Sequence, residues 1–143
     1  MATNGTPFQG RDSIVGPMVY RALTSTGSMQ MILYTNAGDS LGNTSELTDI
    51  VDVSASGYAR MTLGTGWTFT NGTFQYDNGD PDNIIWTNSS AGAWPLDVVG
   101  AAMISSTPYT GGTLFLLHFR DFSSPITLAS GGSIEVDINT LVG

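Results

Sequence analysis

The chain has 143 residues, enough for one domain with a single hydrophobic core. Its 12 acidic and 4 basic residues give a net charge of −8, and lysine is absent, so nucleic acid and anionic membrane surfaces are excluded as favoured partners, because both are bound through clustered cations. The absence of cysteine excludes disulfides and thiolate metal sites.

Nothing in the sequence predicts a targeting or membrane segment. No stretch approaches the roughly 20 apolar residues of a membrane span, and the first dozen residues lack the basic-then-apolar layout of a secretory signal. We therefore expect a soluble protein made in the cytosol. Asn-x-Ser/Thr matches are then interpreted as loop residues, not as glycosylation sites, at Asn4, Asn43, Asn71 and Asn88.

Residues 1–12 are polar and glycine-rich, with Phe8 as the one aromatic side chain, and are predicted to form a flexible N-terminal arm. Residues 13–143 are predicted to form a single domain. The one helical candidate is PMVYRAL at 17–23, because Pro17 suits a first helical turn and Gly27 a stop.

The rest of the chain is strand-like. Runs rich in β-branched and aromatic residues alternate with Gly, Asn, Asp and Ser, at the spacing typical of sandwiches and barrels. The predicted fold is all-β: an antiparallel β-sandwich, jelly-roll-like, with a flexible arm and at most one short helix. Outside the two hairpins discussed next, the runs span 29–35, 47–53, 58–64, 83–87, 97–105 and 112–119.

The sharpest local signal is WTFTNGTFQY, where Asn71-Gly72 is a preferred two-residue hairpin turn. This turn places Phe69 opposite Phe74 and Trp67 opposite Tyr76. All four rings then share one face, which we interpret as core in preference to a sugar-stacking platform.

Two runs, 97–105 and 112–119, are apolar on both faces, as strands in the middle of a sheet are. Small residues at Gly100, Ala101 and Ala102 leave room for a bulky neighbour.

The segment PITLASGGSIEVDI, residues 125–138, contains two strand-like runs around Ser-Gly-Gly. Ile134 and Val136 alternate with Glu135 and Asp137, which predicts one buried and one exposed face. A three-residue loop at 130–132 would bring the apolar faces of the two runs into register, with a glycine in the left-handed position. Alternatively, the two runs pair with other strands in different sheets.

The loop DNGDPDN, Asp77 to Asn83, contains three carboxylates and two amides, an oxygen supply that suits Ca²⁺. Its spacing lacks the ligand order of an EF-hand, and the same residue types are common turn formers. We interpret it as a solvated turn and expect no metal site.

His118 is the only imidazole in the chain, and it follows Leu114 and Leu116 on one predicted strand face, with Arg120 next along. Nucleophilic catalysis would need an oriented acid and a hydroxyl within its reach. We interpret His118 as a partly buried histidine at a strand end, and expect no catalytic residues and no cofactor. Seven acids fall in or near predicted loops and edges, where solubility explains them: Asp39, Glu46, Asp49, Asp52, Asp77, Asp80 and Asp82.

Several segments together resemble the small virion proteins of tailed bacteriophages: LYTN at 33–36, SGYARMTL at 56–63 and GGTLFLLHF…SPITLASGGSIEVDI. Gly57, Tyr58, Ala59 and Arg60 match the family's strand motif, and the ending matches its closing hairpin, with Ser133 where an acid is common. The resemblance covers about residues 29–143. It implies a β-sandwich used as a head decoration, head-fibre or tail-fibre subunit.

The resemblance therefore implies a non-enzymatic structural protein of the virion. We expect a capsid decoration or cement protein that binds the major capsid protein on the outer head surface as an oligomer, by family analogy a trimer, after synthesis in the bacterial cytoplasm. Two alternatives stay open. A tail-fibre or spike domain would bind host glycan through exposed Trp86, Trp94 or Tyr109, and a small glycan hydrolase would need two carboxylates in a cleft.

Overall fold

The computed structural model describes residues 4–5, 29–35, 41–42, 46–63, 67–70, 73–76, 83–105 and 115–137. These residues form antiparallel strands and one short 3-10 helix, η1, so the predicted all-β antiparallel class is confirmed. The elements are β1 (Asn4–Gly5), β2 (Met29–Tyr34), η1 (Leu47–Asp49), β3 (Met61–Leu63), β4 (Trp67–Thr70), β5 (Thr73–Tyr76), β6 (Asn83–Thr87), β7 (Val98–Ser105), β8 (Phe115–Ile126) and β9 (Ser133–Asp137).

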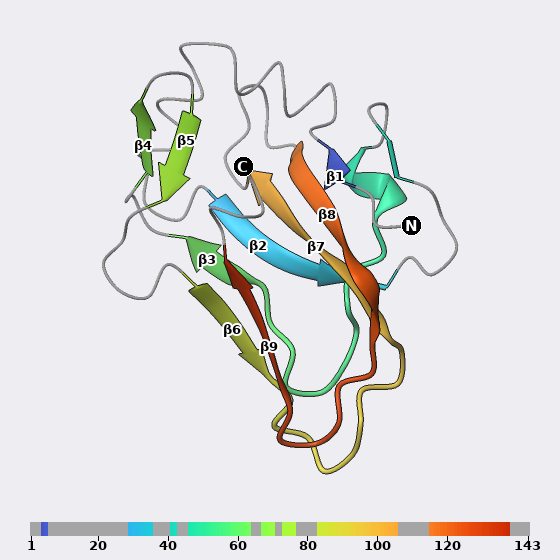
Figure 1. Ribbon diagram of the computed structural model, residues 1–143. Helices are drawn as coiled ribbons and strands as arrows, with labels where there is room; N and C mark the ends of the chain where they lie inside the picture. The colour runs from blue at the N-terminus through green and yellow to red at the C-terminus, as the bar shows by residue number, and fades with distance from the viewer. Residues whose placement is uncertain are drawn as a thin grey trace.

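The largest sheet has the strand order β1-β8-β7-β2-β3, with the long strands β8, β7 and β2 crossing the centre of the molecule (Figure 1). β7 lies in the middle of this sheet, as its doubly apolar sequence predicted. Its residues from Gly100 to Ile104 are all buried, because the sheet is covered on both faces.

The bulky neighbour predicted beside Gly100 is Tyr34. The two residues are directly paired across β2 and β7, and Gly100 is paired in turn with Asp121 of β8. The Tyr34 ring extends over the missing side chain of Gly100, and its hydroxyl donates a hydrogen bond of 2.5 Å to the Asp121 Oδ1. The absence of a side chain at Gly100 therefore allows the Tyr34 side chain to connect β2, β7 and β8.

A β-bulge in β8 changes the predicted surroundings of His118. Ile104 of β7 pairs with Leu116, and the residue before it, Met103, pairs with His118. Leu117 is therefore the additional residue in β8. Residues before and after the bulge point to opposite faces, and the expectation that His118 shares a face with Leu116 is therefore wrong. His118 is also buried inside a strand that continues to Ile126, not at a strand end.

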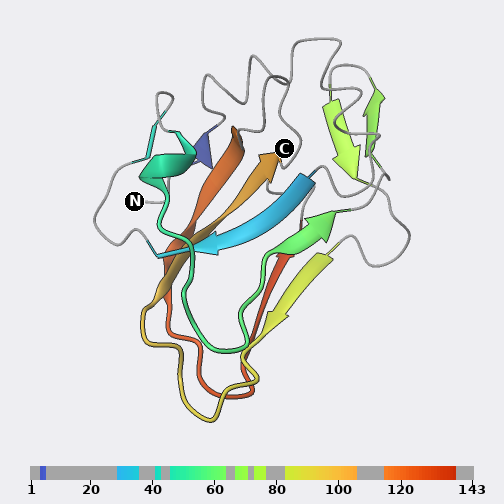
Figure 2. The same cartoon turned by 180° about the vertical axis from the view of Figure 1, so that it is seen from behind.

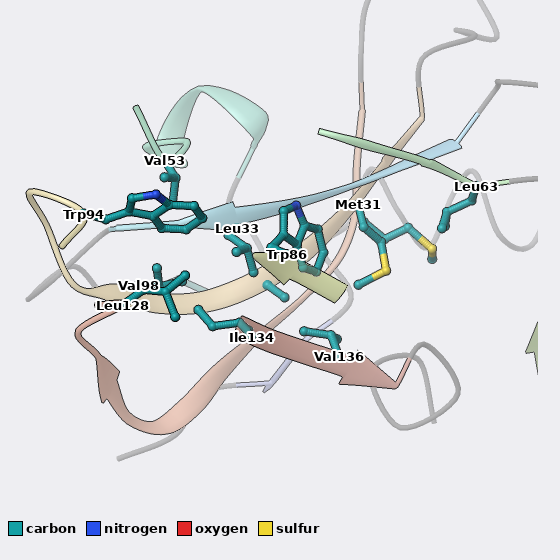
Figure 3. Packing of buried hydrophobic residues seen from close by; sticks show 12 residues of the cluster. Met31, Leu33, Val53, Leu63, Trp86, Trp94, Val98, Leu128, Ile134 and Val136 are labelled. Atoms are coloured by element: carbon teal, nitrogen blue, oxygen red, sulfur yellow. The ribbon is translucent and has the colours of Figure 1, made fainter. Parts of the chain in front are cut away.

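A second sheet consists of β6 and β9, paired antiparallel from Asn83–Asp137 to Thr87–Ser133. Burial alternates along β9 as predicted: Ile134 and Val136 are buried, whereas Glu135 and Asp137 are exposed. The buried face packs against one face of the large sheet. The shared cluster contains Met31, Leu33, Val53, Leu63, Trp86, Trp94, Val98, Ala101, Met103, Leu128, Ile134 and Val136 (Figure 3).

The other face of the large sheet carries a second cluster, which is covered in part by the segment around η1. Leu41 and Ile50 reach this cluster from outside the sheet, and Leu47 packs against it. The sheet contributes Ile32, Tyr34, Ala102, Ile104, Leu116 and Phe119. Both faces of the large sheet are thus buried, which explains its long apolar runs.

The hairpin β4–β5 has the predicted register. Phe69 is paired with Phe74 and Trp67 with Tyr76. The hairpin stands beside the large sheet in both views (Figures 1 and 2). The positions of its side chains lie outside the description, so the choice between core and platform remains a prediction.

Two predicted strands are shorter or absent. In the run 47–53, residues 47–49 form η1, and only Asp52 makes an isolated bridge, to Tyr34. The backbone of this run follows β2 through bonds from Thr35 N to Val51 O (2.9 Å) and Val53 N to Leu33 O (3.0 Å). In the run 58–64, only Met61–Leu63 form a strand.

The closing segment follows the second of the two arrangements considered for it. β8 and β9 belong to different sheets, and the turn between them connects one layer to the other. In the predicted N-terminal arm, Asn4 and Gly5 form β1 and pair with Arg120 and Phe119. The rest of the arm and the predicted helix at 17–23 lie outside the described residues.

Replacing Gly100 by alanine is expected to lower the free energy of unfolding by roughly 1–3 kcal/mol, because the new Cβ overlaps the Tyr34 ring and the carbonyl oxygen of Arg120. Urea denaturation followed by circular dichroism measures this change. Gly92→Ala is the matched control, since nothing lies within 4 Å of its Cβ position. Equal stability of the two variants would contradict the packing described for Tyr34.

Candidate functional site

The chain crosses between the two sheets twice at the same end of the molecule. Residues 88–97 connect β6 to β7, and residues 127–132 connect β8 to β9. Residues 54–57 form a third loop beside them, and all three meet at the lower end of the molecule in Figure 1. We call these three loops the tip. Next to it, the Gly-Tyr-Ala-Arg motif, residues 57–60, contacts other segments of the chain.

Asn88 organises the tip. Its side chain is fully buried, and both amide hydrogens are used: Nδ2 donates to the carbonyl oxygens of Gly92 and Leu128, each at 2.9 Å. Its Oδ1 accepts bonds from the backbone nitrogen and the hydroxyl of Ser90. Asn88 is therefore a structural residue whose amide nitrogen has no room for a glycan, in agreement with the interpretation made from the sequence.

The backbone of Asn88 joins the two crossings a second time. Its nitrogen donates to Gly132 O (2.9 Å), and its carbonyl accepts from Gly131 N (2.8 Å). The intervening turn is closed by a bond from Gly132 N to Ala129 O. Gly131 has φ of 76°, a left-handed conformation that suits glycine, although the three-residue hairpin for which the sequence predicted such a residue is not formed.

The Gly-Tyr-Ala-Arg motif is a junction between the tip and the strands. Gly57 has φ of 81°, and a Cβ there would lie 2.5 Å from the Ser89 hydroxyl. The carbonyl oxygen of Ala59 accepts a 3.0 Å bond from the indole nitrogen of Trp86. The first and third residues of the motif thus hold the loop 54–57 against β6 and the segment that follows it.

The second and fourth residues of the motif converge on Asp52. The Tyr58 hydroxyl donates to Asp52 Oδ1 at 2.6 Å and accepts from the backbone nitrogen of Leu33 at 3.0 Å. Arg60 Nε forms an ion pair with Asp52 Oδ2 at 2.7 Å. Both carboxylate oxygens of Asp52 are therefore used to hold the motif against the edge of β2.

The pKa values of Tyr34 and Tyr58 are raised above the ordinary value for tyrosine. Burial is the largest cause for each, and the hydrogen bond to a carboxylate adds to it, with Asp121 as the partner of Tyr34 and Asp52 as the partner of Tyr58. Both hydroxyls therefore stay protonated and act as hydrogen-bond donors.

The two tryptophans proposed as exposed glycan anchors are buried. Trp86 is 2% exposed and Trp94 is 4% exposed. Trp94 packs edge-to-face on Tyr58, with ring centroids 5.8 Å apart (Figure 3 shows Trp86 and Trp94 in the core). Neither ring offers a stacking surface, so the expectation that they are exposed anchors is wrong. Tyr109, the third proposed anchor, lies outside the described residues.

The other residues considered from the sequence do not meet in one site. Arg120 is partly buried at the pairing with β1, and Glu46 and Asp49 cap η1, where Asp49 Oδ2 accepts from Glu46 N at 2.7 Å. Residues 77–82 of the acidic loop are outside the description. Among the residues the structure does describe, no three His, Asp or Glu side chains form a group able to hold a metal ion.

Comparison with protein-family models, curated proteins and solved structures gave no match. No helix in the described segments is long and apolar enough to cross a membrane.

Asn88→Ala is expected to lower the free energy of unfolding by about 2–4 kcal/mol, because it removes the four hydrogen bonds of a fully buried side chain, two donated to the Gly92 and Leu128 carbonyls and two accepted from Ser90. Urea denaturation measures the loss. Ser133→Ala, which removes an exposed hydroxyl pair with Thr87, serves as the control and is expected to change stability by less than about 0.5 kcal/mol. Similar small losses in both variants would show that Asn88 is not essential to the tip.

Stability is expected to fall as the pH rises above about 10. The chain has no lysine or cysteine, so tyrosines are the side chains that titrate there. The unfolded chain releases the tyrosine protons, whereas the folded chain retains those of Tyr34 and Tyr58. The stabilisation is therefore complete below pH 10 and is lost above it, by up to about 1.4 kcal/mol per pH unit for each tyrosine.

Urea denaturation at a series of pH values between neutral and alkaline measures this slope. Tyr58→Phe and Tyr34→Phe are each expected to make it about half as steep, while the double variant is expected to be nearly independent of pH. An unchanged slope in the double variant would mean that other groups cause the alkaline loss.

Proposed function

We propose that this protein is a non-enzymatic structural subunit of a tailed-phage particle. It decorates or cements the outer surface of the head as an oligomer, a trimer by analogy with the family that its sequence resembles. The proposal names the major capsid protein as its partner and the virion as its location, after synthesis in the host cytoplasm. Its antiparallel sheets would then form a sandwich of the type found in such proteins.

The observation that carries the proposal is the use of the Gly-Tyr-Ala-Arg motif. Tyr58, Ala59 and Arg60 form hydrogen bonds in the junction between the tip and the strands, with Leu33, Asp52 and Trp86. Gly57 lies so close to Ser89 that a Cβ would overlap the Ser89 hydroxyl. Because the matched residues are constrained by the fold, their similarity to the phage proteins supports a shared framework.

The polar side chains in the described core also fit a mechanical role. Asn88, Tyr34 and Tyr58 use their hydrogen-bonding groups to connect segments far apart in the sequence. A framework held in this way needs no disulfide, which suits a protein folded in a reducing cytosol. Exposed acidic residues on η1 and β9 would face solvent on the particle.

Binding to the head would depend on many weak contacts. A single subunit of 143 residues offers a limited area, but an oligomer that engages several capsid subunits at once gains avidity from the high effective concentration of its second and third contacts. The attachment would stabilise the shell by connecting neighbouring capsid subunits.

The test uses heads of the encoding phage purified without this subunit. Wild-type protein is expected to co-sediment with the heads at a saturating, fixed ratio and to raise the temperature at which they release DNA. Heads that already carry the subunit are the control and are expected to take up no more. Absence of saturable binding to undecorated heads would contradict the proposed function.

A further inference from the structure

The tip carries fewer charged side chains than the net charge of the chain would suggest. Leu96 is the most exposed large apolar residue described, at 60%, and Pro95 beside it is exposed as well. Apart from Asp97, the other exposed residues of the tip are small or carry hydroxyls: Ser54, Ser56, Gly57, Ser89, Ala91, Gly92, Ala93, Thr127, Ala129, Ser130 and Gly131.

Only one charged side chain belongs to the tip. Asp97 is that residue, and its Oδ1 accepts a 2.5 Å hydrogen bond from the Thr127 hydroxyl. The chain as a whole has a net charge of −8. Other exposed carboxylates of the described segments lie outside the three loops, at Glu46 and Asp49 near η1 and at Glu135 and Asp137 on β9.

Hydrogen bonds within the chain also hold the tip in the conformation described, without a partner. Asn88 connects both crossings, and further bonds run from Trp94 N to Leu128 O (2.9 Å) and from Ser130 Oγ to Ser90 O (2.6 Å). A preorganised surface loses little conformational entropy on binding, so even a small apolar contact contributes to affinity.

The charge distribution indicates which partner this surface suits. A basic partner would bind best at the carboxylates found elsewhere on the chain. An acidic partner would instead bind where carboxylates are scarce, because like charges repel and buried unpaired charges are costly. A second copy of this chain is such an acidic partner. We propose that the tip is a contact surface between copies of this protein, centred on Leu96.

This inference deepens the oligomeric part of the proposed function and names its surface. Burial of Leu96 and Pro95 drives the contact, and the net charge of each copy opposes it. Self-association is therefore strengthened by added salt, which screens the repulsion. An interface made of ion pairs would respond in the opposite direction.

Sedimentation velocity of the full-length protein at several concentrations, at low and at high NaCl, tests the inference. Wild type is expected to self-associate reversibly, and more tightly at high salt. Leu96→Ser and Ala93→Asp are each expected to weaken the association about tenfold or more, by removing the buried apolar group or by placing a carboxylate in the contact.

Val51→Thr is the matched control, because Val51 is similarly exposed, at 54%, but lies outside the tip. It is expected to associate like wild type. Circular dichroism and thermal melting confirm that each variant is folded, as expected for changes at exposed positions.

Three results would overturn the inference: a wild-type protein that is monomeric at every concentration, tip variants that associate like wild type, or association that weakens with salt. Binding to undecorated heads is measured on the same preparations. Loss of head binding alone in Leu96→Ser would mean that the tip faces the shell, which also overturns it. Self-association without head binding would instead reject the proposed function and leave this inference standing.

Discussion

Asn88 occupies the point at which the polypeptide passes twice between two sheets, and its hydrogen bonds satisfy backbone groups that the crossings bury. A crossing interrupts the regular pairing of strands, so its carbonyls and amides need other partners. Asn88 supplies these from both its side chain and its backbone, to Gly92, Leu128, Gly131 and Gly132. The packing of β6 and β9 on the large sheet depends on this arrangement, because it fixes the end at which the two layers are joined.

The Gly-Tyr-Ala-Arg motif acts at the same end. Its residues connect the segment beside β2 to β6 and to the crossing loop, through Asp52, Ser89 and Trp86. The side chain of Ala59 is exposed, and only its carbonyl takes part in a described bond. The motif is therefore part of the framework that joins the two layers, through the Tyr58 and Arg60 side chains and the Ala59 carbonyl.

Features set by neighbouring residues could be predicted from the sequence. The register of the hairpin β4–β5 followed from Asn71-Gly72, and the alternation along β9 followed from the positions of Ile134 and Val136. Both depend on local turn chemistry and on the two-residue period of a strand. The room beside Gly100 could also be anticipated, although its occupant, Tyr34, could not.

Features set by distant contacts could not be predicted. Nothing local indicates that β9 pairs with β6 instead of β8, that the bulge at Leu117 moves His118 to the opposite face, or that 47–49 form η1. The burial of Trp86 and Trp94 also depends on contacts with residues distant in the sequence. A turn next to a tryptophan suggests exposure, but both rings lie in the cluster between the two sheets, where Trp94 packs on Tyr58.

The order of the strands has a consequence for how the protein folds. β6 and β9 are separated in the sequence by β7 and β8, which pair with each other in the other sheet. Joining β6 to β9 from an unstructured chain would require closing one long loop, but the loop is effectively shorter once β7 and β8 have paired. We therefore expect the β7–β8 pair to form early and the β6–β9 sheet to form late, with the slow kinetics typical of proteins dominated by non-local contacts.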